Sequence, residues 1–148
     1  GAQMLARHLG GTVSPCPQAS IEVGYYPLEV TAGATPLCAW PEKVYQWHTE
    51  GFSMPSGAVR LAGTAQFENQ AFTYGPAAAA VQFHPEITYA LVNRWTSHRP
   101  DRLATKGARP RDEHFQNHFL HAAQVGAWIN TFGRRLLSAE LEVTTAAA

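Results

Sequence analysis

The stretch that most constrains this chain is Gln82-Phe83-His84-Pro85-Glu86, which follows a run of small apolar residues at 77–81. A short apolar run bounded by a Gly-Pro turn predicts a buried strand. Pro85 fixes its own φ and biases His84 toward an extended backbone, so the strand ends in a stiff corner. An imidazole can transfer protons near neutral pH, and the carboxylate of Glu86 could hold its tautomer. Taken alone, the pattern also fits a turn histidine beside an unrelated surface glutamate.

Composition sets the broad class. With 148 residues, 45% hydrophobic and 15% charged, the chain suits one globular domain. Its formal net charge of zero favours neither a nucleic acid nor a membrane surface as a partner. Cys16 and Cys38 are too few for a disulfide framework and indicate a reducing, cytoplasmic location. The chain begins at Gly1 without an initiator methionine, so we expect a front segment to be missing.

Periodicity and turn residues place the elements of an α/β fold. A helix is expected over 1–9, stopped by two glycines, and a second over 89–95. Alternating apolar residues predict strands at 21–26, 43–48, 59–62, 70–74 and 77–83, with an antiparallel hairpin near 70–83.

The last third of the chain reads as a basic stretch, a long helix and a tail. The basic stretch 94–111 lacks interleaved aromatic residues and is expected to be a solvated loop. A long helix follows, ending near Gly133 or Leu137, and the tail 138–148 is expected to be disordered. The predicted buried face of this helix consists of Phe115, Phe119, Ala122, Gly126 and Ile129.

With these pieces in order, the chain resembles the C-terminal two-thirds or more of a class I glutamine amidotransferase domain, of the stand-alone type related to the glutaminase part of GMP synthase. The matching segments occur in order along the chain: Gly1-Ala2-Gln3-Met4-Leu5-Ala6, Leu9-Gly10-Gly11, Glu22-Val23-Gly24, Trp47-His48, Gln70-Ala71-Phe72 and Gln82–Glu86. The resemblance implies a flavodoxin-like fold with a mainly parallel sheet, in which residues 1–137 form the C-terminal part of the domain and the first strands are missing.

The resemblance also implies a chemistry. Enzymes of this family hydrolyse the side-chain amide of L-glutamine through a Cys-His-Glu triad and supply ammonia to a synthase partner. His84 would be the general base and acid, and Glu86 its orienting carboxylate. Gln3, Trp47 and His48 would bind the substrate. No cofactor and no metal are implied, and the ammonia acceptor is not indicated.

The chain departs from the family pattern at the nucleophile, because it does not contain the elbow cysteine. In the family it lies in a Gly-x-Cys-x-Gly-x-Gln elbow, of which Gly1 and Gln3 match the second glycine and the glutamine. The cysteine would therefore lie two residues before Gly1, and the chain alone is expected to be inactive. Neither Cys16 nor Cys38 has elbow glycines or an electropositive setting around it.

Two other functions stay open at this stage. One is a thiol hydrolase of γ-glutamyl or peptide bonds on the same fold, and the other is a non-catalytic interaction protein without a nucleophile. His114, His118 and His121 have a helical spacing that could bind a metal, but no Asp or Cys completes the set. They are expected to form a partly buried polar edge of the long helix.

Overall fold

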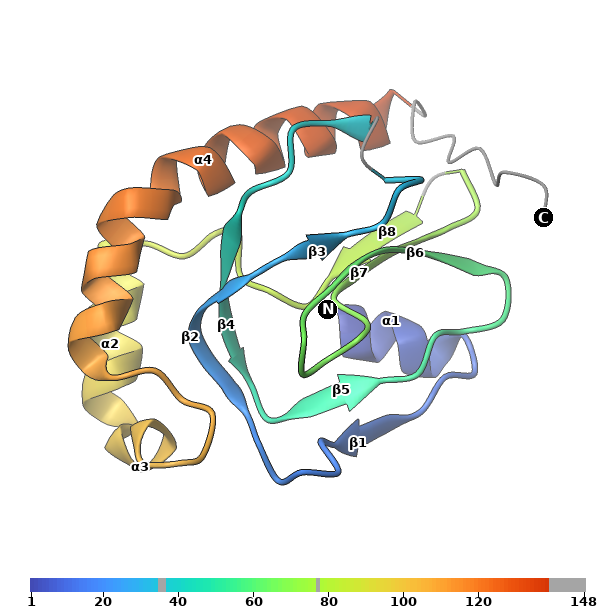
Figure 1. Ribbon diagram of the computed structural model, residues 1–148. Helices are drawn as coiled ribbons and strands as arrows, with labels where there is room; N and C mark the ends of the chain where they lie inside the picture. Colours follow the sequence, from blue (N-terminus) through green and yellow to red (C-terminus); the bar gives the residue numbers. More distant parts are fainter. Residues whose placement is uncertain (35–36, 77, 139–148) are drawn as a thin grey trace.

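The computed structural model describes residues 1–34, 37–76 and 78–138. Figure 1 shows a mixed α/β arrangement in which strands lie between a short N-terminal helix and a long C-terminal one. The elements are α1 (Ala2–His8), β1 (Val13–Pro15), β2 (Glu22–Pro27), β3 (Glu29–Val30), β4 (Lys43–His48), β5 (Glu50–Phe52), β6 (Ala58–Gly63), β7 (Ala71–Tyr74), β8 (Ala78–Val81), α2 (Tyr89–His98), α3 (Pro100–Leu103) and α4 (Arg111–Leu137). Within these residues, no helix combines the length and the apolar character needed to cross a membrane.

The named strands pair antiparallel throughout. β2 pairs with β4, β1 pairs with β5, and β3, β6, β7 and β8 form a four-stranded sheet in that order. A parallel bridge joins Val23 of β2 to Ala108, which lies outside the named strands. The prediction of a mainly parallel sheet is therefore wrong for the described residues. Parallel pairing needs a long crossover, usually a helix, and no α-helix lies between β1 and β8 in the described part of the chain.

Several local predictions are confirmed. α1 lies within the expected helix, β4 has the expected bounds, and β7 and β8 form the expected antiparallel hairpin. Helix α1 ends where Gly10 takes a φ of 91°, a left-handed conformation that glycine adopts without a steric penalty.

The four-stranded sheet has a helix on each face. Ala71 and Phe72 are neighbours on β7, and they belong to different core clusters because successive side chains of a strand point to opposite faces. Phe72 packs with Ala2 and Ala6 of α1. Ala71 packs on the other side with the cluster that contains Trp128 of α4. Figure 1 shows α4 curving along the outside of the strands, with α2 beside its first half.

The buried face of α4 differs from the predicted one. Phe119 is 89% exposed, whereas His114, Val125, Trp128 and Phe132 are buried. The successive spacings of these four residues are eleven, three and four, which places them on one side of the helix. The buried stripe therefore begins one position earlier than expected. His114 therefore lies on the inner side of α4, against Tyr45 of β4, whereas His118 and His121 are half-buried, as expected for a polar edge of the helix.

The basic stretch is also more structured than predicted. Its residues form the end of α2, all of α3 and the start of α4. Arg102 contacts the Trp47 carbonyl, Arg109 lies over the ring of Tyr26, and Arg111 bonds Asn93. The prediction of a solvated loop is wrong here, because these arginines hold the segment to the body of the protein. Of the expected tail, Ser138 caps α4, and residues 139–148 lie outside the described residues.

Candidate functional site

His84 and Glu86 meet because the chain turns tightly between them. The backbone N–H of His84 donates to the Tyr45 carbonyl on β4 at 2.9 Å, which fixes the start of the turn. The His84 carbonyl accepts from the Ile87 N–H at 3.2 Å, with Pro85 at the turn position that its fixed φ suits. The turn brings Nδ1 of His84 to 2.8 Å from Oε1 of Glu86.

The surroundings of this pair leave one side of the ring open. The His84 side chain is 30% exposed and that of Glu86 is 61% exposed. Trp95 of α2 packs edge-on against the imidazole, with 4.9 Å between ring centroids. Within the described part of the chain, Nε2 of His84 has no hydrogen-bond partner. A carboxylate on Nδ1 and a free Nε2 form an arrangement that can accept and return a proton at Nε2.

The carbonyl oxygen of Glu50 joins α1 to the strand end that carries His84. Nε2 of Gln3 donates to this oxygen at 2.8 Å, and Nε2 of Gln82 donates to the same oxygen at 3.1 Å. Gln82 lies two residues before His84, so the two predicted site regions, far apart in sequence, converge on one backbone atom.

The predicted substrate residues Trp47 and His48 take different positions. The ring of Trp47 lies in an aromatic group with Tyr45 and Trp95, at 6.3 and 5.4 Å between centroids. Trp95 thus contacts both Trp47 and His84. The His48 side chain is only 8% exposed and points into a buried polar network, with Nδ1 at 3.0 Å from the Glu50 carbonyl. The structure therefore brings Gln3, His48 and the strand end before His84 together around Glu50.

Sequence reasoning gave no role to three residues that the structure places here: Trp95, Gln82 and Glu22. Gln82 and Glu22 lay inside matched segments, and a signal was available for Glu22: a lone acid in an otherwise apolar strand. Such a residue is buried only when it is hydrogen-bonded. Gln70, which also lay in a matched segment, bonds Glu22. Nothing in the local sequence around Trp95 marks it as a contact of His84.

The two cysteines lie in settings that do not favour a nucleophile. Cys38 packs against the core cluster of Trp128, and burial raises the pKa of its thiol. A raised pKa leaves less thiolate at neutral pH. Cys16 is buried, and its Sγ donates to Oε1 of Gln18 at 2.9 Å. Neither cysteine forms a hydrogen bond with His84 in the described part of the chain.

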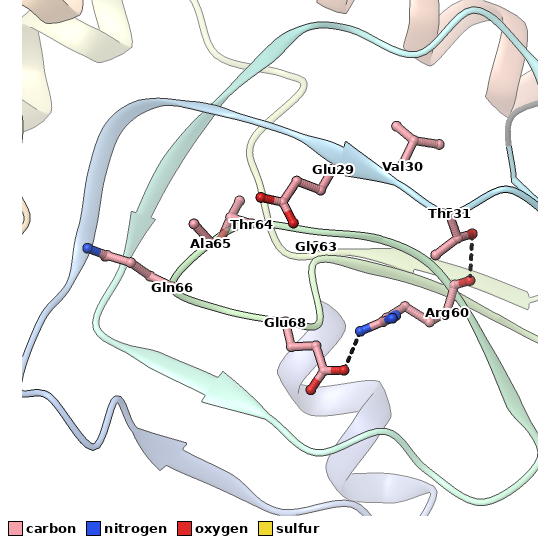
Figure 2. Close-up of a pocket in the computed structure, with 9 residues that line it drawn as sticks. All are labelled: Glu29, Val30, Thr31, Arg60, Gly63, Thr64, Ala65, Gln66 and Glu68. Atoms are coloured by element: carbon pink, nitrogen blue, oxygen red, sulfur yellow. Dashed lines mark hydrogen bonds and ion pairs between the residues drawn. The ribbon is translucent and has the colours of Figure 1, made fainter.

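A pocket of about 450 Å³ opens beside β3 and the end of β6 (Figure 2). Figure 2 shows Arg60 paired with Glu68, while Glu29 extends toward Thr64. The nine lining residues include no histidine or cysteine, so this pocket has no group suited to nucleophilic or proton-transfer chemistry near neutral pH. We therefore place the candidate site at His84.

The histidines of α4 pair with tyrosines. Nδ1 of His114 lies 3.0 Å from the Tyr45 hydroxyl and Nε2 lies 3.1 Å from the Arg109 carbonyl, while Nδ1 of His118 lies 2.8 Å from the Tyr25 hydroxyl. No cluster of metal-ligating side chains occurs in the described ranges. A neutral His114 with its proton on Nε2 satisfies both of its contacts.

We expect the stability of the fold to decrease on acidification. Burial lowers the pKa of His114, and likewise of His118 and His121. The unfolded chain then binds more protons than the folded one, so stability is complete above the unfolded pKa of about 6.5 and falls as pH drops below it. The slope for His114 is at most about 1.4 kcal/mol per pH unit. Urea unfolding at several pH values between 5 and 8 measures it, and His114→Gln should flatten the slope. An unchanged slope in that variant would contradict this assignment.

We compared the chain with known proteins by sequence and by structure. No family model matches the chain. A GMP synthase (glutamine-hydrolyzing) from Prochlorococcus marinus (strain MIT 9515) is 30% identical over 94 residues, which cover 61% of this chain and 18% of that protein. A glutamine amidotransferase crystal structure from Thermotoga maritima has a TM-score of 0.77 at 29% identity, over 93% of this chain and 59% of that chain. In sequence and in fold, this chain is similar to glutamine amidotransferases.

A second glutamine amidotransferase, from Methylobacillus flagellatus, has the same fold. It superposes with a TM-score of 0.84 at 24% identity, and the match covers 94% of this chain and 60% of that chain. The resemblance inferred from sequence is thus confirmed. The chain spans about three-fifths of the two solved glutamine amidotransferases and 18% of the GMP synthase.

Proposed function

We propose that this chain carries the acid–base half of a glutaminase site, in which a Cys-His-Glu triad hydrolyses the side-chain amide of L-glutamine and releases ammonia for a synthase partner. The observation that carries the proposal is the His84–Glu86 pair, 2.8 Å apart on a tight turn with Nε2 of His84 open. The nucleophile would be a cysteine two positions ahead of Gly1. Gln3 supports this placement, because it joins α1 to the segment that ends at His84.

The chemistry assigns a distinct role to each group. His84 Nε2 takes the proton of the cysteine thiol, and the thiolate sulfur forms a bond to the amide carbon of glutamine. When the C–N bond breaks, His84 returns the proton to the leaving nitrogen, and ammonia departs from a thioester. His84 then takes a proton from water, whose oxygen attacks the thioester; the proton returns to sulfur, and glutamate is released. Glu86 holds the proton on Nδ1 throughout and stabilises the imidazolium.

The test compares the 148-residue chain with a longer one read from the same gene. We expect a cysteine codon two positions before Gly1, and ammonia release from glutamine only by the protein that contains it. Changing that cysteine to alanine should abolish release. Ammonia release by the 148-residue chain, lost on Cys16→Ser or Cys38→Ser, would overturn the triad placement.

The same assay separates the alternatives. A γ-glutamyl peptide cleaved in preference to glutamine would instead identify a thiol hydrolase. A gene without the cysteine would leave an interaction protein as the function.

A further inference from the structure

Glu22 is a fully buried carboxylate that the proposed reaction does not use. It is 0% exposed on β2, and the register of β2 with β4 places it opposite His48. Its Oε1 accepts from the Thr64 hydroxyl at 2.6 Å, and its Oε2 accepts from Nε2 of Gln70 at 2.8 Å. Burying a carboxylate is costly unless donors surround it, so this arrangement strongly constrains the groups that face it.

The third group facing Glu22 is the ring of His48, whose Nε2 lies 3.2 Å from Oε2. Nε2 must carry a hydrogen to make this contact favourable, since a carboxylate only accepts. Nε2 of Gln70 also lies 3.4 Å from Nε2 of His48. Its two amide hydrogens have the shorter partners Glu22 at 2.8 Å and Thr64 at 3.3 Å, so we assign them to these groups and not to His48. The ring is held in place by Phe67, which packs edge-on at 4.6 Å between centroids. Glu22 therefore selects the form of His48 that is protonated on Nε2.

The opposite nitrogen of the same ring faces Gln82 and the backbone of Glu50. Nδ1 of His48 lies 2.9 Å from Nε2 of Gln82 and 3.0 Å from the Glu50 carbonyl. The two lone pairs of that carbonyl are taken by the amides of Gln3 and Gln82. An unprotonated Nδ1 then accepts the second hydrogen of the Gln82 amide. Both hydrogens of that amide are thereby used, and its orientation is fixed.

We propose that Glu22 is a positioning residue: by keeping the His48 proton on Nε2, it orients the Gln82 carboxamide, which with Gln3 holds the Glu50 carbonyl at the glutamine-binding side of the site. The expected effect on glutamine binding rests on the proposed function. The position of the proton on His48 does not. The buried residues Glu22, His48 and Gln82 thus connect β2 to the Glu50 carbonyl, on which Gln3 of α1 also converges.

The orientation is tested on the 148-residue chain by nitrogen NMR of ¹⁵N-histidine, with the His48 signal assigned by its loss in His48→Gln. We expect the wild-type ring to be protonated on Nε2 with Nδ1 bare. Glu22→Gln can turn an amide N–H toward Nε2 and should move the proton to Nδ1. Glu68→Gln is the matched control, because it makes the same change at an exposed glutamate that pairs with Arg60 and not with His48, and it should not change the tautomer. A wild-type ring protonated on Nδ1 alone, or an unchanged tautomer in Glu22→Gln, would overturn the proposal.

The consequence is tested in the longer, cysteine-containing enzyme. Glu22→Gln should raise KM for glutamine about tenfold or more while changing kcat less, as expected for loss of a supporting contact. An unchanged KM would overturn the positioning role. If the wild-type enzyme releases no ammonia from glutamine, the proposed function is wrong, and the NMR result still decides the role of Glu22 independently. If Glu22→Gln does not fold, the wild-type spectrum alone still decides which ring nitrogen of His48 carries the proton.

Discussion

Replacing His84 with alanine in the cysteine-containing enzyme should reduce ammonia release from glutamine by about 10⁴-fold or more, close to the background rate. The reason is that, in the proposed mechanism, His84 Nε2 takes the thiol proton and returns it to the leaving nitrogen. Its neighbour Trp95 packs on the ring without a group that can titrate near neutral pH. Steady-state ammonia release measures the effect, and His98→Ala, at an exposed histidine near the end of α2, is the control that should keep full activity.

The effect of Glu86→Gln should be smaller, about 10²-fold. Glu86 contacts Nδ1 at 2.8 Å, on the opposite side of the ring from Nε2, so in the proposed mechanism its loss should disturb the tautomer of His84 without removing the base. Glutamine binding should survive both changes, because Gln3 and His48 do not depend on the pair. Binding is measured by calorimetry in a background where the cysteine is alanine. A His84→Ala enzyme that kept a tenth of the rate, or a Glu86→Gln enzyme at full rate, would contradict the assignment.

Replacing Trp128 with alanine should cost about 3–5 kcal/mol of unfolding free energy, the largest stability effect we expect from one side chain. Trp128 is 1% exposed and stacks on Phe132 with 4.8 Å between centroids. It also contacts Trp40 at 5.1 Å and Phe83 at 5.3 Å. Removing the indole leaves a cavity between α4 and the sheet, and domains of this kind have only about 5–15 kcal/mol in total.

Phe119→Ala on the same helix is the matched control. Phe119 is 89% exposed, so its truncation should change the unfolding free energy by no more than about 0.5 kcal/mol. The unfolding free energy of both variants is measured by urea unfolding at pH 7.5, followed by far-ultraviolet circular dichroism. Equal losses in the two would show that the buried face of α4 has been assigned incorrectly. Because Phe83 precedes His84, a partly folded Trp128→Ala protein should also lose activity.

The sequence by itself determined the features whose geometry is decided within a few residues. The corner at Pro85 follows from the fixed φ of proline, and the hairpin of β7 and β8 follows from a turn between two short apolar runs. The end of α1 at Gly10 is local in the same way. The family resemblance could be recognised because its segments occur in order along the chain, which does not depend on how the chain folds.

Only the tertiary structure decided how distant segments meet. Strand direction depends on which segments pair, and the period-2 pattern is the same for parallel and antiparallel partners. The inner face of α4 was misassigned because the side chain of His114 is buried by bonds to Tyr45 and Arg109, which no hydrophobicity pattern reveals. The meeting of Gln3 and Gln82 on one carbonyl, and the pairing of Glu22 with His48, come from the register of β2 on β4 and the packing of α1. Such contacts follow from the burial of polar groups that must find partners across the fold, and the local sequence does not say which partners those are.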